Sequence, residues 1–355
     1  MLPHRLADTP SASTDAAVRS TDLDALTSRC SAHSLGYIDD PLSLLFLPPA
    51  QRRNPDKRPP LINLGTHART WAVDELVEQF LAASSSGEGG AQPRQVLSLG
   101  AGNDTRFWRM RKRWADEGRE WTCRKWVEVD FPEATGSKAR VVSMKAELKG
   151  QLGGDVKIEL GGQGLSSPLY ALLPGDLRSL SALSSSLLSA PPSGSSPEPI
   201  LDPSLPTLLL LECVLVYLEP AVTDELLRWS CETFAAERSA VVTYDPFGLD
   251  DAFGAVMKRN LAARNLSLPG ADSTPSLSSL SSHLSSAGCA GACGALSVKE
   301  IKEGCVPLEE AERVAKIEQI DEVEELNLVL SHYAVSWGNV VSGGEGGIGL
   351  VKRGG

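Results

Sequence analysis

Apolar residues follow two different patterns along most of this chain. Short continuous runs, such as TLLLL at 207–211, are typical of strands in a sheet that is covered on both faces. Longer stretches, in which apolar residues recur every three or four positions, are typical of helices that bury one side. The first pattern predicts strands at 95–99, 125–130, 168–173, 206–211, 239–244, 294–301 and 332–338. The second predicts helices at 103–116, 133–149, 177–188, 220–237, 249–266 and 307–330.

This succession of strands and helices determines the expected class of fold. Strands that alternate with helices at this spacing predict an α/β fold with a doubly wound parallel sheet. The last strand, at 332–338, follows a helical stretch and mixes apolar with polar residues. We therefore expect it to run antiparallel to its neighbours.

The chain is expected to form a single domain over residues 21–340. Residues 1–20 are polar and rich in Pro, Ser and Thr, which predicts a disordered lead-in. Helices are expected in the region 21–85, before the alternating core at 94–340 begins. Residues 341–355 follow as a C-terminal tail.

Two stretches inside the core, 184–204 and 268–294, are rich in Ser, Gly, Pro and Ala. This composition predicts flexible insertions. In the second stretch, Leu277, Leu280 and Leu284 could instead form one face of a helix. Neither stretch carries recognisable chemistry.

The overall composition restricts the classes of partner. Of the 355 residues, 42% are hydrophobic and 22% are charged, as in soluble globular proteins. A net charge of −11 argues against binding to nucleic acid, which depends on clustered Lys and Arg. The one basic cluster, at 106–113, lies on a predicted helix, and we expect it to be a solvated face. No apolar run reaches membrane length, so no membrane partner is expected.

The seven cysteines are an odd number, and the sequence shows no secretory leader. Reduced thiols and a cytoplasmic or nuclear location are therefore expected. Cys289 and Cys293 could form half of a metal site, but no second pair stands at zinc-site spacing, and the five histidines are scattered. We expect no metal.

The stretch VLSLGAGNDTRFW, at 96–108, places a Gly-Ala-Gly turn directly after a predicted strand. Glycine lets the main chain approach a bound group that a Cβ atom would block. Dinucleotides and other adenosine-containing cofactors both use such turns. The dinucleotide pattern needs a third glycine, and here Thr105 follows Gly100 and Gly102 instead. By itself the turn is also compatible with an ordinary strand-to-helix connection.

Acidic residues stand at the carboxyl ends of four successive predicted strands: Asp104, Asp130, Asp176 and Glu212. This is where open α/β sheets bind ligands. Each has an ordinary alternative, since Asp130 and Asp176 could cap the helices that follow them. Taken alone, Asp104 and Asp176 favour such an ordinary structural role. Asp130 and Glu212 favour a functional role, because a carboxylate next to a buried strand needs partners.

Together these acids favour S-adenosylmethionine. This cofactor carries a ribose diol, an exocyclic amine and a cationic amino-acid end, which carboxylates bind by charge-assisted hydrogen bonds. A pyrophosphate would be repelled by the same groups.

Eight segments in the same order resemble one known family, the leucine carboxyl methyltransferases. They are TDLDALTSRCSAHSLGY, NLGTHART, LGAGNDTRFWR, VEVDFPEATGSKA, PGDLRSL, LLLLECVLVYLEP, DPFGLDDAFGAVMKRNL and QIDEVEELNLVLSHYAVSWG. The resemblance covers roughly residues 21–340. It implies a class I S-adenosylmethionine-dependent methyltransferase fold, with a Rossmann-like seven-stranded sheet and an N-terminal helical cap at 21–85.

The resemblance also implies a reaction. A methyl group would pass from S-adenosylmethionine to the α-carboxylate of the C-terminal leucine of type 2A protein phosphatase catalytic subunits, and a methyl ester would form. The enzyme would act as a monomer. The residues that would bind the cofactor are Gly100, Gly102, Asp130 at the ribose, Asp176 and Leu177 at the adenine, and Glu212 at the methionine end.

Three further residues match the family's reaction pocket. Arg69 and Arg29 correspond to the basic residues that hold carboxylate near the methyl donor, so both are expected to have catalytic and cofactor-binding roles. Tyr217 matches an aromatic residue of that pocket. Arg29 stands where the family often has Lys, which keeps the charge but changes the hydrogen-bond geometry.

Other functions remain open at this point. The glycine turn and the acid of the second strand are compatible with an NAD(P)-dependent oxidoreductase. A related carboxyl or O-methyltransferase with another acceptor, and a phosphatase-binding module without activity, are further alternatives. Relatives that act on a modified transfer-RNA base carry a β-propeller, and this acidic chain has no repeat of that kind.

Overall fold

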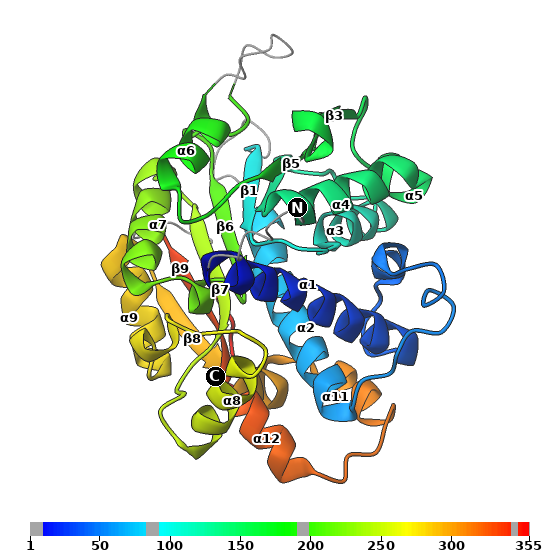
Figure 1. Ribbon diagram of the computed structural model, residues 1–355, viewed down its shortest axis with the longest axis vertical. Coiled ribbons are helices and arrows are strands. Elements are labelled where there is room, and N and C mark those ends of the chain that lie inside the picture. Colours follow the sequence, from blue (N-terminus) through cyan, green and yellow to red (C-terminus); the bar gives the residue numbers. More distant parts are fainter. Residues whose placement is uncertain (1–9, 83–91, 190–198, 342–346, 355) are drawn as a thin grey trace, which may run out of the picture.

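The structure is a computed structural model that describes residues 10–82, 92–189, 199–341 and 347–354. Its described residues form one nine-stranded sheet with helices on both faces (Figure 1). The strands are β1 Arg94–Leu99, β2 Cys123–Asp130, β3 Lys157–Glu159, β4 Gly164–Ser166, β5 Tyr170–Pro174, β6 Thr207–Glu212, β7 Ala240–Pro246, β8 Cys293–Ser297 and β9 Tyr333–Asn339.

The order of strands in the sheet is β3-β4-β5-β2-β1-β6-β7-β9-β8. Strands β5, β2, β1, β6 and β7 are parallel, and β9 pairs antiparallel with both β7 and β8. The predicted parallel sheet and its antiparallel last strand are therefore confirmed. The expected number of seven strands is wrong, because β3 and β4 add an antiparallel hairpin next to β5. Each of these two strands is only three residues long, which is too short to show a periodic pattern.

The helices and short helical turns follow in chain order. They are α1 Pro10–Leu35, η1 Pro41–Phe46, α2 Pro60–Ala82, α3 Arg106–Asp116, α4 Pro132–Met144, α5 Ala146–Lys149, η2 Leu160–Gly162, α6 Leu180–Leu188, η3 Leu215–Tyr217, α7 Pro220–Thr233, α8 Ala252–Ala262, η4 Ala271–Ser273, α9 Leu277–Ala287, α10 Val298–Glu300, η5 Ile301–Cys305, α11 Leu308–Ala315 and α12 Val323–Ser331. None of the described helices is long and apolar enough to cross a membrane.

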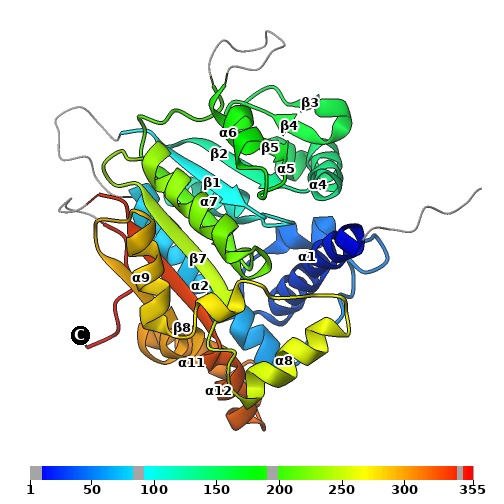
Figure 2. The same ribbon diagram turned by 60° about the vertical axis from the view of Figure 1, so that its left-hand side comes forward.

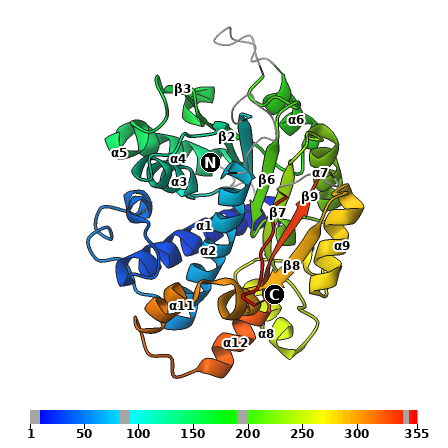
Figure 3. The ribbon, with the colours of Figure 1, turned by 180° about the vertical axis from the view of Figure 1, so that it is seen from behind.

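Side chains of successive strand residues point to opposite faces, so each strand contributes to two hydrophobic cores. Val96, Trp126 and Leu208 pack with apolar residues of α2, α3 and α4 on one face. Leu97 and Leu209 pack with residues of α6, α7 and α9 on the other. Figure 2 shows α7 and α9 in front of the sheet, and Figure 3, from behind, shows α2 and α3.

Several predicted boundaries are corrected by the structure. The first helix begins at Pro10, so the expected disordered lead-in of residues 1–20 is wrong for residues 10–20, and residues 1–9 lie outside the described residues. The predicted helix at 307–330 is interrupted after Ala315 and resumes at Val323.

The stretch 268–294 is not a flexible insertion. It contains α9, whose N-terminal Ser276 forms a capping box with Ser279. Leu280 and Leu284 are buried, as the alternative helical interpretation predicted. Of the other stretch, residues 190–198 lie outside the described residues, and α6 extends into its beginning.

The C-terminal tail is also partly integrated into the core. Ile348 and Leu350 are buried, and Gly349 packs against the indole of Trp337 in β9. Asn339 fixes the tail through hydrogen bonds with both backbone groups of Ile348 (2.9 and 3.1 Å). The tail thus covers the end of the antiparallel strands.

Candidate active site

A cavity of about 500 Å³ lies at the carboxyl ends of β1, β2, β5 and β6, and residues of α1 and α2 line its other wall. The sequential order of strands reverses between β1 and β6, and such points are the usual ligand sites of open α/β sheets. All the residues that the sequence predicted for the site line this cavity: Arg29, Arg69, Gly100, Gly102, Asp130, Asp176, Leu177, Glu212 and Tyr217.

The glycine turn after β1 needs glycine for two structural reasons. Gly100 and Gly102 adopt φ angles of 64° and 47°, in the left-handed region that favours glycine. A Cβ atom on Gly100 would come within 2.5 Å of the Val214 side chain, and one on Gly102 would collide with the carboxylate of Asp22. The turn is therefore enclosed by α1 and by the segment after β6, while its backbone faces the cavity.

Asp130 connects the ends of the two neighbouring strands β1 and β2. Its carboxylate accepts hydrogen bonds from the backbone amides of Gly102 and Phe131, both at 2.7 Å. Burial raises the pKa of Asp130, and these two amides counteract part of that shift. The carboxylate is therefore held in a fixed orientation beside the glycine turn.

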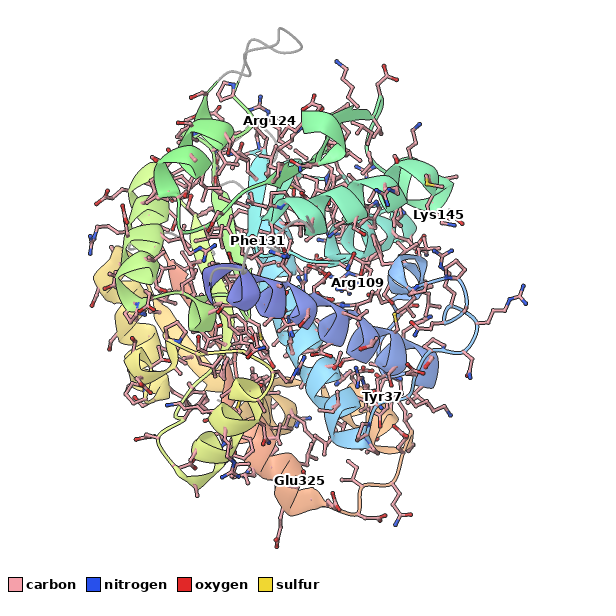
Figure 4. All side chains as sticks on the ribbon, in the orientation of Figure 1. Tyr37, Arg109, Arg124, Phe131, Lys145 and Glu325 are labelled. Atoms are coloured by element: carbon pink, nitrogen blue, oxygen red, sulfur yellow. The ribbon has the colours of Figure 1, made fainter. Side chains whose placement is uncertain are left out.

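The end of the cavity near β5 is open to solvent. Asp176 accepts a hydrogen bond from the backbone amide of Arg178 (2.9 Å), and the two side chains form a salt bridge (2.7 Å). Arg178 also reaches Asp15 of α1 through two bonds of 2.9 Å. The hydrogen bond from Arg178 lowers the pKa of Asp176. Nearby, Arg19 of α1 lies over the ring of Phe131. Phe131 is labelled in Figure 4.

The opposite end of the cavity contains a buried charge cluster around Glu212. One oxygen of Glu212 accepts a hydrogen bond from Nε of Arg69, and the other forms an ion pair with Nη1 of Arg106. Both distances are 2.7 Å. Burial alone would raise the pKa of Glu212, but the two guanidinium groups hold it below its usual value. Glu212 is therefore ionised and fixed at both oxygens.

Arg106 extends this cluster away from the cavity. It pairs with Asp74 of α2 (2.7 Å) and with Asp104 (2.5 Å), and its side chain is fully buried. The expectation that the basic cluster at 106–113 forms a solvated face is therefore wrong for Arg106. It is also wrong for Arg109, which pairs with Asp74 (2.5 Å) and is 13% exposed.

Asp104 has more than the ordinary structural role that the sequence favoured. One of its oxygens accepts a hydrogen bond from the Arg106 backbone amide (3.1 Å), as a helix cap would. The carboxylate also forms ion pairs with the side chains of Arg106 and Arg29. Arg29 in turn pairs with Asp40, which is fully buried (3.3 Å). The guanidinium of Arg29, which lines the cavity, is thus held by two carboxylates.

Tyr217 lies in the short turn η3, directly after β6. Before this turn, Cys213 adopts a left-handed backbone conformation (φ 55°), which is uncommon for a residue other than glycine. Asp245 of β7 fixes the turn by accepting a hydrogen bond from the Val216 amide (3.2 Å). Tyr217 is half-buried, and burial raises the pKa of its hydroxyl.

Three residues of this region were missed by the sequence interpretation. Tyr244 lies against Arg69, Asp22 accepts two hydrogen bonds from Asn103 in the glycine turn, and Arg106 holds Glu212. A signal existed for Arg106. Asp74 and Glu78 stand four residues apart on α2. They pair with Arg106, Arg109 and Arg113, which stand three or four residues apart on α3.

The cavity fits one cofactor class better than another. Among the described residues, seven acids and five arginines line it, so a pyrophosphate would meet an excess of carboxylates. Asp130 and Asp176 offer acceptors for hydroxyl and amine groups, and Glu212 offers an anion for an ammonium. The sheet order and this donor set define an S-adenosylmethionine-dependent methyltransferase.

Comparisons with known proteins identify the family. The family model described as "Leucine carboxyl methyltransferase" matches residues 17–231. Leucine carboxyl methyltransferase 1 of Cryptococcus neoformans is 44% identical over 295 residues, which cover 78% of this chain and 79% of that protein. The homologue in Arabidopsis thaliana is 35% identical (75% and 72% covered), and the rat protein is 32% identical (74% and 72% covered). The chain belongs to the leucine carboxyl methyltransferase family, and the oxidoreductase alternative is not favoured.

Proposed function

We propose that this enzyme methylates the α-carboxylate of a C-terminal leucine, and that its protein substrate is the catalytic subunit of type 2A protein phosphatases. The proposal extends to this chain the acceptor that its family resemblance implies. The geometry around Arg69 is the observation that supports it most directly.

Arg69 has one edge occupied and one edge accessible. Its Nε atom donates to Glu212, whereas its two Nη groups have no hydrogen-bond partner in the described part of the chain. The side chain lines the cavity and is 22% exposed. Two parallel Nη–H donors match the two oxygens of a carboxylate. Arg69 is therefore suited to orient a carboxylate within the cavity.

The cavity wall next to Arg69 suits an apolar side chain. Leu61, Ile62 and Gly65 precede Arg69 on α2 and line the cavity. Leu330 of α12 lies so close to Gly65 that a Cβ atom added there would be 3.4 Å from the leucine side chain. Aliphatic walls of this kind favour a branched aliphatic side chain over a polar one. A leucine whose carboxylate is held by Arg69 meets both requirements.

The mechanism needs no general base. S-adenosylmethionine supplies a methyl group on a positively charged sulfur, which a carboxylate oxygen can accept by in-line displacement. A C-terminal carboxyl has a pKa of about 3.5, so it is already an anion at neutral pH. The described lining contains no histidine. The task of the protein is then to orient the acceptor and exclude water.

The remaining residues receive roles from their positions. Asp130 would bind the ribose hydroxyls, with Gly100 and Gly102 beside it, and Asp176 with Leu177 would bind the adenine. Glu212 would bind the ammonium of the methionine end. Arg29 and Tyr217 would complete the reaction pocket, where Arg29 adds positive charge behind the carboxylate.

The test is incubation with labelled S-adenosylmethionine and a purified type 2A phosphatase catalytic subunit. Label is expected on the intact subunit, and none on a subunit that lacks its terminal leucine or carries an amidated carboxyl group. A short C-terminal peptide should be a poor substrate, because its small contact area does not offset the entropy lost on binding. Label on the leucine-deleted subunit would show that a side chain is the acceptor and would refute the proposal.

A further inference from the structure

Tyr244 of β7 lies directly against the guanidinium of Arg69. The Cζ atom of Arg69 is 4.3 Å from the centre of the Tyr244 ring, and the tyrosine is 8% exposed. In the sheet, Tyr244 is the register partner of Glu212, which holds Nε of the same arginine. Neighbouring positions on two parallel strands thus supply both contacts of Arg69.

These two contacts constrain the guanidinium in different directions. The hydrogen bond to Glu212 fixes one edge of the group but leaves rotation about that bond possible. The aromatic face of Tyr244 restrains the guanidinium from a second direction, because its positive charge is attracted to the face of the ring. Together, the two contacts limit the orientations that the Nη donors can adopt.

The tyrosine is itself held firmly. Its ring stacks on Tyr333 of β9, with the ring centres 5.6 Å apart and the planes 16° from parallel. Its carbonyl accepts a hydrogen bond from the Cys213 amide (2.6 Å), and Tyr244 pairs with Val335 in the antiparallel ladder. The ring is therefore a rigid support for the arginine.

The ring, rather than the hydroxyl, makes these contacts. Within the described ranges, no residue forms a hydrogen bond with the Tyr244 hydroxyl, although the side chain lines the cavity. A role of the ring and a role of the hydroxyl predict different variants, so they can be separated by substitution.

We infer that Tyr244 is a positioning residue, whose ring orients the Arg69 guanidinium so that its Nη edge can clamp the carboxylate of the acceptor. This inference rests on the proposed function, since it assigns the carboxylate at Arg69 to the protein substrate. Tyr244 acts through Arg69 and needs no contact with the reacting atoms.

The test combines a conservative variant, a disruptive variant and a double-mutant cycle. Tyr244→Phe keeps the ring and is expected to stay within about threefold of the wild-type kcat/KM for the phosphatase subunit. Tyr244→Leu, or Tyr244→Met if the leucine variant does not fold, removes the ring and should lower kcat/KM about ten- to thirtyfold. In an Arg69→Lys background the same change should have little further effect, because the two residues act as one unit.

Two results would overturn the inference. A loss in Tyr244→Phe as large as that in Tyr244→Leu would assign the role to the hydroxyl. Fully additive losses in the Arg69→Lys background would show that Tyr244 acts independently of Arg69.

Crystal structures of the variants separate this inference from the proposed function. Arg69 should keep its orientation in Tyr244→Phe and lose it in Tyr244→Leu, whatever the acceptor. If the wild-type enzyme transfers no labelled methyl group to the phosphatase subunit, the proposed function is refuted. The variant structures would still show whether Tyr244 orients Arg69. An unchanged Arg69 in Tyr244→Leu would refute the positioning role alone.

Discussion

At one end of the cavity, Glu212 lies between two arginines, Arg69 and Arg106, whose side chains are 22% and 0% exposed. At the other end, Asp176 pairs with Arg178, and these side chains are 38% and 42% exposed. We call these the buried end and the open end. Both contain an acid paired with arginine, but water reaches only one of them freely.

This difference determines what each end can contribute. Charges that are screened by water interact weakly and can exchange partners, whereas buried pairs keep their geometry and are costly to break. The buried end is therefore suited to fix the reacting groups. The open end, where α1 meets the segment after β5, is suited to admit and release a ligand.

Arg106→Met should have the largest effect, because it breaks the buried end at its centre. It removes a cation shared by Glu212, Asp104 and Asp74, and leaves these carboxylates short of partners. We expect the free energy of unfolding to fall by about 3–5 kcal/mol, measured by urea denaturation. Arg113→Met is the matched control on the same helix, and its side chain is 44% exposed. If both variants lose the same small amount, the buried end is no more rigid than the surface.

Glu212→Gln should have the next largest effect. It keeps the shape of the side chain but leaves Arg69 and Arg106 without their shared anion, and we expect a loss of about 3 kcal/mol in stability. Affinity for S-adenosylmethionine, measured by calorimetry on the folded variant, should fall as well. Unchanged affinity would show that Glu212 has a structural role only.

These two predictions also mark the limit of the sequence interpretation. Glu212, Asp130 and the glycine turn could be predicted because strand ends of a parallel sheet converge, so local motifs are enough to bring them together. Arg106 could not be placed in this way. Its burial depends on how α3 packs against α2, and a run of basic residues on a helix is usually solvated.

The same reasoning explains the errors in the fold. The sequence predicted the major strands because their apolar residues form short runs or alternate with polar ones. The hairpin of β3 and β4 is held by its pairing with β5, and α9 is rich in serine but buries two leucines against the sheet. In both cases tertiary contacts, rather than local composition, stabilise the element.

Another buried acid, Asp245, sharpens the comparison with Glu212, because among the residues that the structure describes no cation lies close to it. Asp245 is 6% exposed, and its Oδ2 atom has no hydrogen-bond partner among the described residues. Burial raises its pKa to about 7, only partly offset by backbone amides and by the more distant Arg69. Glu212, with two arginines in contact, shifts in the opposite direction.

The sign of the resulting pH dependence follows from linkage. The folded protein binds the Asp245 proton more tightly than the unfolded chain, whose Asp has a pKa of about 4. The contribution of Asp245 to stability is therefore fully present below a pH of about 4. It is lost, by about 1 kcal/mol per pH unit, as the pH rises toward the folded pKa of about 7. Asp245→Asn should remove this contribution from unfolding curves at pH 5 and 8. An unchanged difference between the two pH values would show that Asp245 is ionised throughout.

Arg178→Ala should have the smallest effect, because it breaks only the open end. The substitution removes the bonds of Arg178 to Asp176 and to Asp15, which join α1 to the segment after β5. Exposed pairs contribute little, so we expect a stability loss below about 1 kcal/mol that shrinks further at high salt. Dissociation of S-adenosylmethionine, followed by stopped-flow fluorescence, should accelerate by up to about fivefold, because α1 is held less firmly over the cavity.

Lys112→Ala is the matched control for Arg178→Ala. Lys112 pairs with Asp116 on the surface of α3 and does not line the cavity, so its loss should leave the dissociation rate unchanged. A large, salt-insensitive loss of stability in Arg178→Ala would mean that the open end is as rigid as the buried end. Entry of the cofactor would then require a movement elsewhere in the wall, and the division of the cavity into a fixed end and an exchangeable end would have to be abandoned.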